Sequence, residues 1–267
     1  MNLAERGAEL LGGALADTRR LAGGDLSEVT QITLADGRTA VVKGGPSPRA
    51  EAAMLKAIAA AGAPAPKVLA ADAAVLVLEE LADDGNLRRA EADLGRALAR
   101  LHAAEGQAYG WNEDYAFAAV AIENAAADDW PRFWGERRIL TSVPFVPAAL
   151  GRRLEALVRA LPELLPAQPK ASLLHGDLWG GNALAADGKV TGLIDPASYY
   201  GDGEVDIAML NLFGAPGAAF YAAYGPLAAG WCERQPIYKL WPALVHLRLF
   251  GAGYRSLVES LLQKIGF

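Results

Sequence analysis

The sequence predicts an α+β protein of two lobes: a small N-terminal lobe built from an antiparallel sheet and one helix, and a larger, mainly helical C-terminal lobe. Residues 29–43 hold two β-branched runs joined by a turn, which is typical of a hairpin. Residues 81–87 read LADDGNL, a composition typical of a linker. From residue 88 onward most apolar positions recur at helical spacing. We therefore assign residues 1–81 to the N-terminal lobe, with a hinge at its end, and residues 82–267 to the C-terminal lobe.

Size, charge and cysteine content narrow the class of protein. A chain of 267 residues, 52% of them hydrophobic, is long enough to bury two lobes that share a cleft. The formal charge of −6 argues against a nucleic-acid partner, because such partners usually require a basic face. Cys232 is the single cysteine, so no intramolecular disulfide can form, as is typical of a reducing compartment.

No targeting or membrane segment is expected. Glu5, Arg6 and Glu9 interrupt the region where a signal peptide would need an apolar run. No uncharged stretch reaches the roughly 18 apolar residues of a membrane span. We expect a cytoplasmic protein without membrane or nucleic-acid partners, and the sequence leaves its oligomeric state open.

The first elements follow from a change of hydrophobic period. Residues 2–16 carry Leu3 and Leu10 at helical spacing, which predicts an amphipathic opening helix. Val29–Leu34 and Thr39–Lys43 are β-branched runs joined by Ala-Asp-Gly-Arg, so they predict a hairpin with a lysine at its end.

The rest of the N-terminal lobe is predicted as one helix and two strands. Residues 49–61 repeat apolar positions on one face, with Glu51 in the first turn, and a glycine and two prolines then end the helix. Residues 68–70 and 75–78 are apolar runs that predict the two further strands.

The C-terminal lobe is predicted to consist mainly of helices. Residues 88–105 and 147–165 each carry an apolar stripe at helical spacing. Trp130, Phe133 and Trp134 fall at i, i+3 and i+4, which indicates a packing stripe. Further helices are expected over residues 205–213, 218–229 and 237–264.

Residues 174–195, LHGDLWGGNALAADGKVTGLID, hold the polar residues that predict chemistry. His175, Asp177 and Asn182 have the spacing of a kinase catalytic loop, in which His-x-Asp is followed by Asn. An Asp-Gly pair then predicts the turn of a short hairpin, whose second strand delivers Asp195 at its end. We expect the loop and the strand end to face one another.

This residue set predicts phosphoryl transfer from ATP. Asp177 is expected to accept or orient the proton of the attacking hydroxyl, and its position matters more than a shifted pKa. Asn182 and Asp195 are expected to supply oxygen ligands for Mg²⁺, which offsets phosphate charge. ATP and Mg²⁺ are therefore the predicted cofactors.

Two other classes of function compete with a kinase. A metal hydrolase built on His175, Asp177 and Asp195 would need several metal-binding histidines, and the chain has 3 in all. A catalytically silent nucleotide-binding protein would have no need for the complete polar set. Turnover with an acceptor distinguishes a kinase from both.

Three stretches resemble the fructosamine kinase (ketosamine 3-kinase) family, within a wider group that includes aminoglycoside phosphotransferases and choline kinases. They are HGDLWGGN, LIDPASYYGDGEVDIAMLNLFG (residues 193–214) and RQPIYKLWPALVHLRLFGAGY (residues 234–254). The resemblance runs from about residue 23 to the last helix. It implies a protein-kinase-like fold and phosphorylation of a sugar hydroxyl, with a ketosamine as the small-molecule acceptor.

The resemblance also implies roles for residues of the N-terminal lobe. Lys43 would aim its ammonium at the nucleotide phosphates, and Glu51 would pair with it. Ser27, in a turn with two glycines, would contact phosphate oxygens. The segment after the fourth strand would be a hinge whose backbone binds the adenine edge, although the residues alone fit a surface turn equally well. The hinge residues are Glu79, Glu80 and Leu81.

In the C-terminal lobe the resemblance implies supporting roles and one departure. Trp179 would form the floor of the acceptor site, and His175 and Asp206 would brace the catalytic loop by hydrogen bonds. Pro196, in an Ile-Asp-Pro sequence, implies a rigid metal segment without activation-loop control. Residues 116–127 depart from the family pattern, so the acceptor could instead be an aminoglycoside, choline or a homoserine-like molecule.

Overall fold

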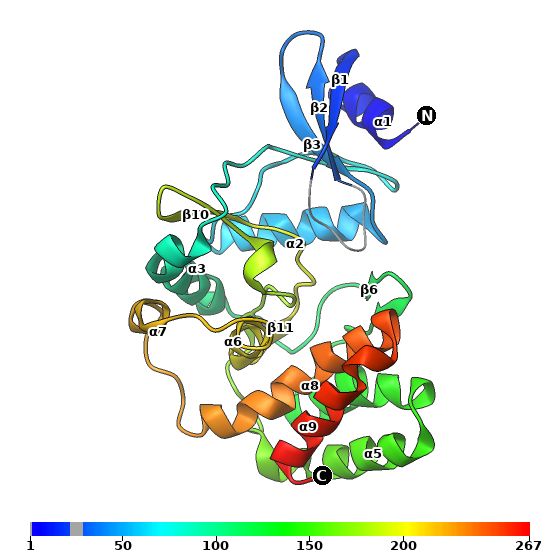
Figure 1. Ribbon diagram of the computed structural model, residues 1–267, viewed down its shortest axis with the longest axis vertical. Coiled ribbons are helices and arrows are strands. Elements are labelled where there is room, and N and C mark those ends of the chain that lie inside the picture. The colour runs from blue at the N-terminus through cyan, green and yellow to red at the C-terminus, as the bar shows by residue number, and fades with distance from the viewer. Residues whose placement is uncertain (1, 22–28) are drawn as a thin grey trace.

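The computed structural model describes residues 2–21 and 29–267 and has a sheet-containing upper part above a mostly helical lower part (Figure 1). The main sheet has five strands in the order β1-β2-β3-β5-β4, and all neighbouring strands are antiparallel. The elements of this part are α1 (Leu3–Leu10), β1 (Leu15–Arg20), β2 (Val29–Leu34), β3 (Thr39–Lys43), α2 (Pro48–Ala60), β4 (Val68–Ala71) and β5 (Leu76–Leu78).

Two helices cover the main sheet. Ala4 and Ala8 of α1 pack with Ile32 and Val42 of the central strands, all of them buried. On α2, Leu55 packs with residues of β5 in a separate buried cluster. The alternation of buried and exposed positions along β2 and β3 leaves Lys43 at the end of a strand that is covered by helices.

The opening of the chain differs from the prediction of a helix over residues 2–16. Helix α1 ends at Leu10, because Gly12 adopts a φ of +66° that continues no helix, and residues 15–20 form strand β1. Strand β1 is an edge strand with almost every side chain exposed, so its sequence lacks the apolar alternation that would have indicated a strand.

The remainder of the chain is mainly helical. Its helices are α3 (Glu91–Ala103), α4 (Trp130–Trp134), α5 (Ala148–Leu164), α6 (Glu204–Leu210), α7 (Ala218–Tyr224), α8 (Trp231–Phe250) and α9 (Arg255–Ile265). Short helical turns cover Leu87–Ala90, Gly135–Ile139, Leu140–Phe145, Gly180–Asn182 and Ala252–Tyr254. Three two-stranded sheets pair β6 (Tyr115–Phe117) with β7 (Val120–Ile122), β8 (Ser172–Leu173) with β11 (Tyr200–Gly201), and β9 (Ala183–Ala186) with β10 (Lys189–Leu193).

An aromatic cluster forms the core of the helical part. Trp130, Phe133 and Trp134 are at most 1% exposed, so the predicted packing stripe is confirmed. The fully buried Arg138 lies over the ring of Tyr199, with its guanidinium carbon 4.2 Å from the ring centroid, and donates to backbone and amide oxygens. Hydrogen bonds and aromatic rings therefore stabilise the charge of Arg138 in place of an ion pair with a carboxylate.

A second buried cluster joins the two parts of the chain. Ile58 of α2 packs with Leu94 and Leu98 of α3, Leu193 of β10 and Phe220 of α7. Helix α2, which lies directly beneath the sheet in Figure 1, is thus shared between both parts. This packing fixes the position of α2 relative to the β9–β10 hairpin.

In the helical part of the chain one further prediction was wrong and one element was not predicted. Residues 237–264 are not one helix, because α8 begins earlier, at Trp231, and ends at Gly251, whose φ is +82°. The β6–β7 hairpin was not predicted, since its strands of three residues are too short to show a period. Most other elements lie within a few residues of their predicted positions.

The predicted α+β class, with a small antiparallel sheet and a larger helical part, is confirmed. Within the described residues, no helix combines the length and the apolar character that crossing a bilayer requires.

Candidate active site

The loop between β8 and β9 is held in place by Asp206, the third residue of α6. Its carboxylate accepts the backbone N–H of His175 (2.7 Å) and of Gly176 (2.9 Å), and lies 3.1 Å from His102 Nε2. Burial raises the pKa of Asp206, but the hydrogen bonds from His102 and Gly176 outweigh burial, so the pKa lies below its usual range. The predicted brace is therefore geometrically in place.

Gly176 must be a glycine for this loop to close. Its φ is +83°, and a Cβ at this position would meet the carbonyl oxygen of Ala197. The glycine therefore lets the catalytic loop approach the chain that follows Asp195.

His175 connects the loop to the strand end. Its fully buried ring donates from Nε2 to the carbonyl of Ile194 (2.9 Å) and accepts at Nδ1 from the N–H of Asp177 (3.3 Å). Burial lowers the pKa of His175, so the neutral ring that these bonds require is favoured. His175 does not line the cavity described below, in agreement with its predicted bracing role.

Asp177 and Asn182 lie together, as their spacing predicted. Asn182 Nδ2 donates to the Asp177 backbone carbonyl (2.8 Å) and to its Oδ2 (3.2 Å). Burial, followed by the negative charge of Asp195, raises the pKa of Asp177 to about 7. Residue type and spacing do not indicate this shift, because it depends on how closely the two acids approach.

Asp195 lies at the end of β10 in a left-handed conformation, with a φ of +55°. A residue with a side chain adopts that conformation at a cost of roughly 1–3 kcal/mol. The conformation places Asp195 Oδ1 2.5 Å from Lys43 Nζ. Backbone strain at this residue thus accompanies a contact between distant parts of the chain.

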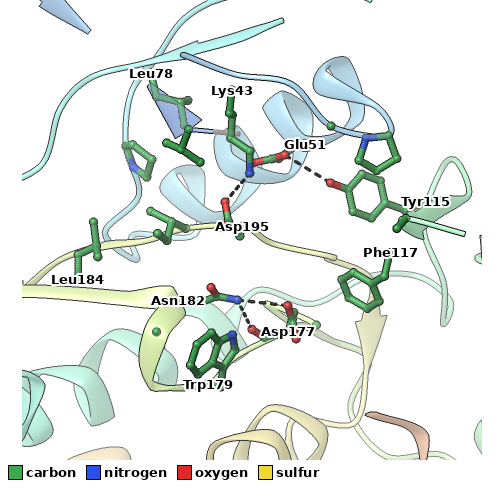
Figure 2. Close-up of a pocket in the computed structure, with 18 of the residues that line it drawn as sticks. Lys43, Glu51, Leu78, Tyr115, Phe117, Asp177, Trp179, Asn182, Leu184 and Asp195 are labelled. Atoms are coloured by element: carbon green, nitrogen blue, oxygen red, sulfur yellow. Dashed lines mark hydrogen bonds and ion pairs between the residues drawn. The ribbon is translucent and has the colours of Figure 1, made fainter. Parts of the chain in front are cut away.

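Lys43 and Glu51 form the predicted ion pair, at 2.9 Å, and are 5% and 2% exposed. Burial lowers the pKa of Lys43, but the charges of Glu51 and Asp195 outweigh it, and the net pKa is raised. Burial raises the pKa of Glu51 despite the lysine. Figure 2 shows Lys43 between Glu51 and Asp195, with Asn182 and Asp177 below.

Tyr115 of β6 also contacts Glu51 (Figure 2). Its hydroxyl donates to Glu51 Oε2 at 3.4 Å, and burial raises its pKa. Sequence reasoning did not identify Tyr115, since the residues lie 64 positions apart. The β6–β7 hairpin thereby contacts the glutamate that pairs with Lys43.

One cavity of about 990 Å³ contains most of the predicted site. This volume is at the upper end of the range for single ligand sites, roughly 300–1,000 Å³. Its lining includes the predicted residues Lys43, Glu51, Glu79, Glu80, Leu81, Asp177, Trp179, Asn182 and Asp195. His175 and Asp206 stand behind the lining, and Ser27 lies outside the described residues.

The hinge residues border an apolar part of this cavity. Val41, Leu78 and Leu184 line it beside Leu81. Within the described residues, the Leu81 backbone makes no hydrogen bond, whereas the Glu79 N–H donates to the carbonyl of Lys67. Val41 could have been found from the sequence, because it lies two residues before Lys43 and so on the same face of β3.

Trp179 lies on the cavity side of the catalytic loop. It is 40% exposed, and its indole packs over Gly181, where any Cβ would overlap the ring. Figure 2 shows the indole below Asn182. A planar apolar surface is therefore exposed close to Asp177 and Asn182.

Asn182 and Asp195 suit a hard divalent cation. Within the described residues, Asn182 Oδ1 accepts no hydrogen bond, and its amide nitrogen is already used toward Asp177. An amide oxygen and a carboxylate are the donors that Mg²⁺ accepts beside phosphate and water. No cluster of three or more His, Cys, Asp or Glu residues in the described ranges has a metal-binding arrangement.

Comparisons with known proteins agree with this geometry. The sequence model of the family described as fructosamine kinase matches residues 10–266. A Synechocystis protein named probable ketoamine kinase is 38% identical over 179 residues, which is 64% of this chain and 60% of that protein. A probable ketoamine kinase of Staphylococcus aureus is 33% identical over 81% of this chain and 80% of its own length. The chain spans 60–65% of the length of the first curated relatives that it matches.

Solved structures share the fold. A Thermobifida fusca protein assigned as a fructosamine-3-kinase superposes with a TM-score of 0.90, at 31% identity, over 99% of this chain and 98% of its own. A macrolide 2'-phosphotransferase from Brachybacterium faecium has a TM-score of 0.64 at 21% identity, covering 97% of this chain and 98% of its own, and shows the fold alone. The fold is therefore kinase-like, and the chain belongs to the fructosamine kinase family.

Proposed function

We propose that the protein is an ATP-dependent kinase that transfers the γ-phosphoryl group to a sugar hydroxyl of a ketosamine. The observation that carries this proposal is the convergence of Lys43, Asp177, Asn182 and Asp195 on one cavity. Lys43 comes from β3, Asp177 and Asn182 from one loop, and Asp195 from the chain that follows β10, and each belongs to a type that phosphoryl transfer requires. The names of the relatives, ketoamine kinases, support the acceptor class.

The nucleotide would occupy the end of the cavity beside the hinge. Val41, Leu78 and Leu184 offer apolar faces to the adenine ring, and the Leu81 backbone offers a hydrogen-bond donor and acceptor. Lys43, oriented by Glu51, would contact phosphate oxygens, and Ser27 is proposed to do the same by family resemblance.

Asn182 and Asp195 would hold Mg²⁺, which neutralises phosphate charge as the bond to the leaving group breaks. The ion pair between Asp195 and Lys43 holds the carboxylate at the cavity lining. The backbone of Ile194, next to Asp195, connects both ligand residues, since it accepts from His175 and donates its N–H to the carbonyl of Asn182 at 3.0 Å.

Asp177 would take the proton of the acceptor hydroxyl. A pKa of about 7 is close to neutral pH, where a carboxylate is both substantially ionised and basic enough to accept a proton. The Asn182 side chain orients Asp177 by donating to its Oδ2. The indole of Trp179 would support the sugar ring beneath this carboxylate.

The proposal includes a division of the chain into a nucleotide lobe, residues 1–81, and an acceptor lobe, residues 82–267. The hinge residues at the end of the first lobe lie at the cavity edge, which supports this division. We also infer a reducing, cytoplasmic setting from the single, unpaired Cys232.

Release of ADP in the presence of Mg²⁺, ATP and a panel of acceptors tests this function. The panel is fructoselysine, ribuloselysine, choline and an aminoglycoside. We expect turnover with the two ketosamines and loss of turnover in Asp177→Asn with ATP binding retained. A thermal shift with Mg-ATP but no turnover on any acceptor would indicate a silent nucleotide-binding protein and refute the proposal.

A further inference from the structure

The cavity has a second end with a different chemistry. Beyond Asp177 its lining comes from the β6 strand and from helices α6 and α8, which approach one another closely: the rings of Phe117 and Trp241 are 6.2 Å apart. We call this end the apolar wall, made of Phe117, Val205, Met209, Trp241, Pro242, Val245, Leu249 and Phe250.

The apolar wall as defined contains no Asp, Glu, Lys or Arg side chain. Between residues 205 and 250, the titratable side chains that line the cavity are Tyr238 and His246. The Tyr238 hydroxyl donates to Asp202 Oδ2 at 2.7 Å. The His246 ring packs against Phe213 and lies with Nδ1 2.8 Å from the carbonyl of Pro242. The Tyr238 hydroxyl and His246 Nδ1 are therefore occupied by the protein itself.

The wall still exposes apolar surface to the cavity. Val205, Trp241 and Val245 are buried and form its back, whereas Phe250 is 47% exposed and Phe117 and Leu249 are half-buried. Figure 2 shows the ring of Phe117 facing Asp177 across the cavity. A ligand held at Asp177 would therefore extend into apolar surroundings.

These surroundings discriminate between substituents by their charge. Each methylene that leaves water against such a surface improves affinity by roughly fourfold. A carboxylate placed there loses hydration and gains no partner. Because the sugar hydroxyl must lie at Asp177, the group on the amine of the acceptor is the part left to contact the wall.

We propose that the apolar wall binds the substituent on the acceptor's amine and selects an aromatic or alkyl group over one that carries a carboxylate. This inference rests on the proposed function and narrows it. The preferred acceptors are ketosamines of apolar amines, and the determinant is the surface shared by β6 and α8.

A matched pair of acceptors tests the selectivity. The fructose adducts of butylamine and of 4-aminobutyrate differ by one methyl in place of one carboxylate. We expect kcat/KM to be on the order of 30-fold higher for the butylamine adduct, and higher again for the phenethylamine adduct. KM for ATP should be the same with all three, since the nucleotide end is unchanged.

Variants test whether the acceptor selectivity depends on the apolar wall. Leu249→Lys adds a cation to the wall. It should lower the ratio of kcat/KM between the butylamine and 4-aminobutyrate adducts about tenfold, because the first adduct is used less well and the second better. Leu69→Lys, at a leucine 44% exposed on β4 outside the cavity, is the matched control and should leave the ratio unchanged. Phe117→Ala should reduce use of the phenethylamine adduct about tenfold, whereas Phe145→Ala, at another exposed phenylalanine outside the cavity, should not.

The possible outcomes distinguish a failure of this inference from a failure of the proposed function. No phosphorylation of any ketosamine would overturn the proposed function. Phosphorylation of both adducts with equal kcat/KM, or with a preference for the carboxylate, would leave the function standing and overturn the selectivity. The same ratio in Leu249→Lys as in the parent protein would show that the wall does not contact the substituent.

Discussion

Asp177 and Asp206 are two carboxylates of one site, the first half-buried and the second fully buried, with opposite pKa shifts. Asp206 accepts two backbone N–H groups and contacts His102, and its pKa is lowered although burial alone would raise it. Asp177 receives one side-chain donor, lies near Asp195, and has a pKa raised to about 7. Burial therefore does not decide the sign of the shift. The number of donors facing the carboxylate and the charge of its neighbours decide it.

The same contrast distinguishes a carboxylate that holds a loop in place from one that is suited to act as a base. A carboxylate saturated with donors fixes a loop but is a poor base, because its proton affinity is low. A carboxylate with few donors next to another acid destabilises the fold and gains proton affinity. Asp177 lies in the catalytic loop itself, whereas Asp206 holds the same loop from α6 through the N–H groups of His175 and Gly176.

The largest expected effect is on the rate of Asp177→Asn. The amide cannot accept the hydroxyl proton, so we expect kcat to fall by about 10²–10⁴-fold with a KM for ATP that changes little. Steady-state ADP release and ATP titration by calorimetry would measure both. A near-parental kcat would remove Asp177 from the mechanism.

The same variant tests how the raised pKa of Asp177 affects the stability of the folded state. Because the folded state raises the pKa of Asp177 above its unfolded value, near 3.8, folding is favoured below that value and loses stability as pH rises through about 7. Asp177→Asn removes this loss. Its Tm should exceed that of the parent at pH 8 and match it more closely at pH 4.5, as thermal denaturation at both pH values would show.

Asp206→Ala should have the second largest effect, on stability. Two buried N–H groups lose their acceptor, at a cost of roughly 1–3 kcal/mol each. The lowered pKa means that this contribution is complete above the unfolded pKa and is lost as pH falls through the folded pKa. Urea denaturation at pH 7 measures the loss, and Asp206→Asn, which keeps one acceptor oxygen, should lose less.

A pH–rate profile gives the third test. Protonation of Asp177 should lower kcat/KM by tenfold per pH unit below an apparent pKa near 7 in the free enzyme, about three units above an ordinary aspartate. Binding of metal and nucleotide adds positive and negative charge, so the profile of kcat can differ from that of kcat/KM. A flat kcat/KM between pH 5 and 8 would contradict the raised pKa.

The smallest expected effect belongs to Tyr115→Phe. Its hydroxyl lies 3.4 Å from Glu51, a long hydrogen bond, so its removal should raise KM for ATP by only a few fold through a looser Lys43. Glu51→Gln, which removes the charge facing Lys43, should raise it more. Equal values in both variants would mean that the charge of Glu51 does not position Lys43.

Local signals in the sequence predicted much of this arrangement. The β2–β3 hairpin was predicted from two β-branched runs, and the turn before β10 from Asp187 and Gly188, which both have positive φ. Asp177, Asn182 and Asp195 were found from one motif, because a catalytic loop and a following hairpin are close in sequence.

The remainder depends on contacts across long sequence separations. Tyr115 and Phe117 reach the cavity from a hairpin too short to show a period, and the apolar wall combines β6 with α8. The pKa of Asp177 depends on Asp195, 18 positions away along the chain, and on burial. Such features arise only when the chain is folded, so residue type and spacing could not reveal them.

Helix α2 is anchored at three successive points. Glu51 pairs with Lys43, Met54 Sδ accepts the N–H of Ser198 at 3.3 Å, and Ile58 packs in the cluster shared with α3. A displacement of α2 would therefore break an ion pair, a hydrogen bond and apolar packing at the same time, so the position of Lys43 depends on packing in both parts of the chain.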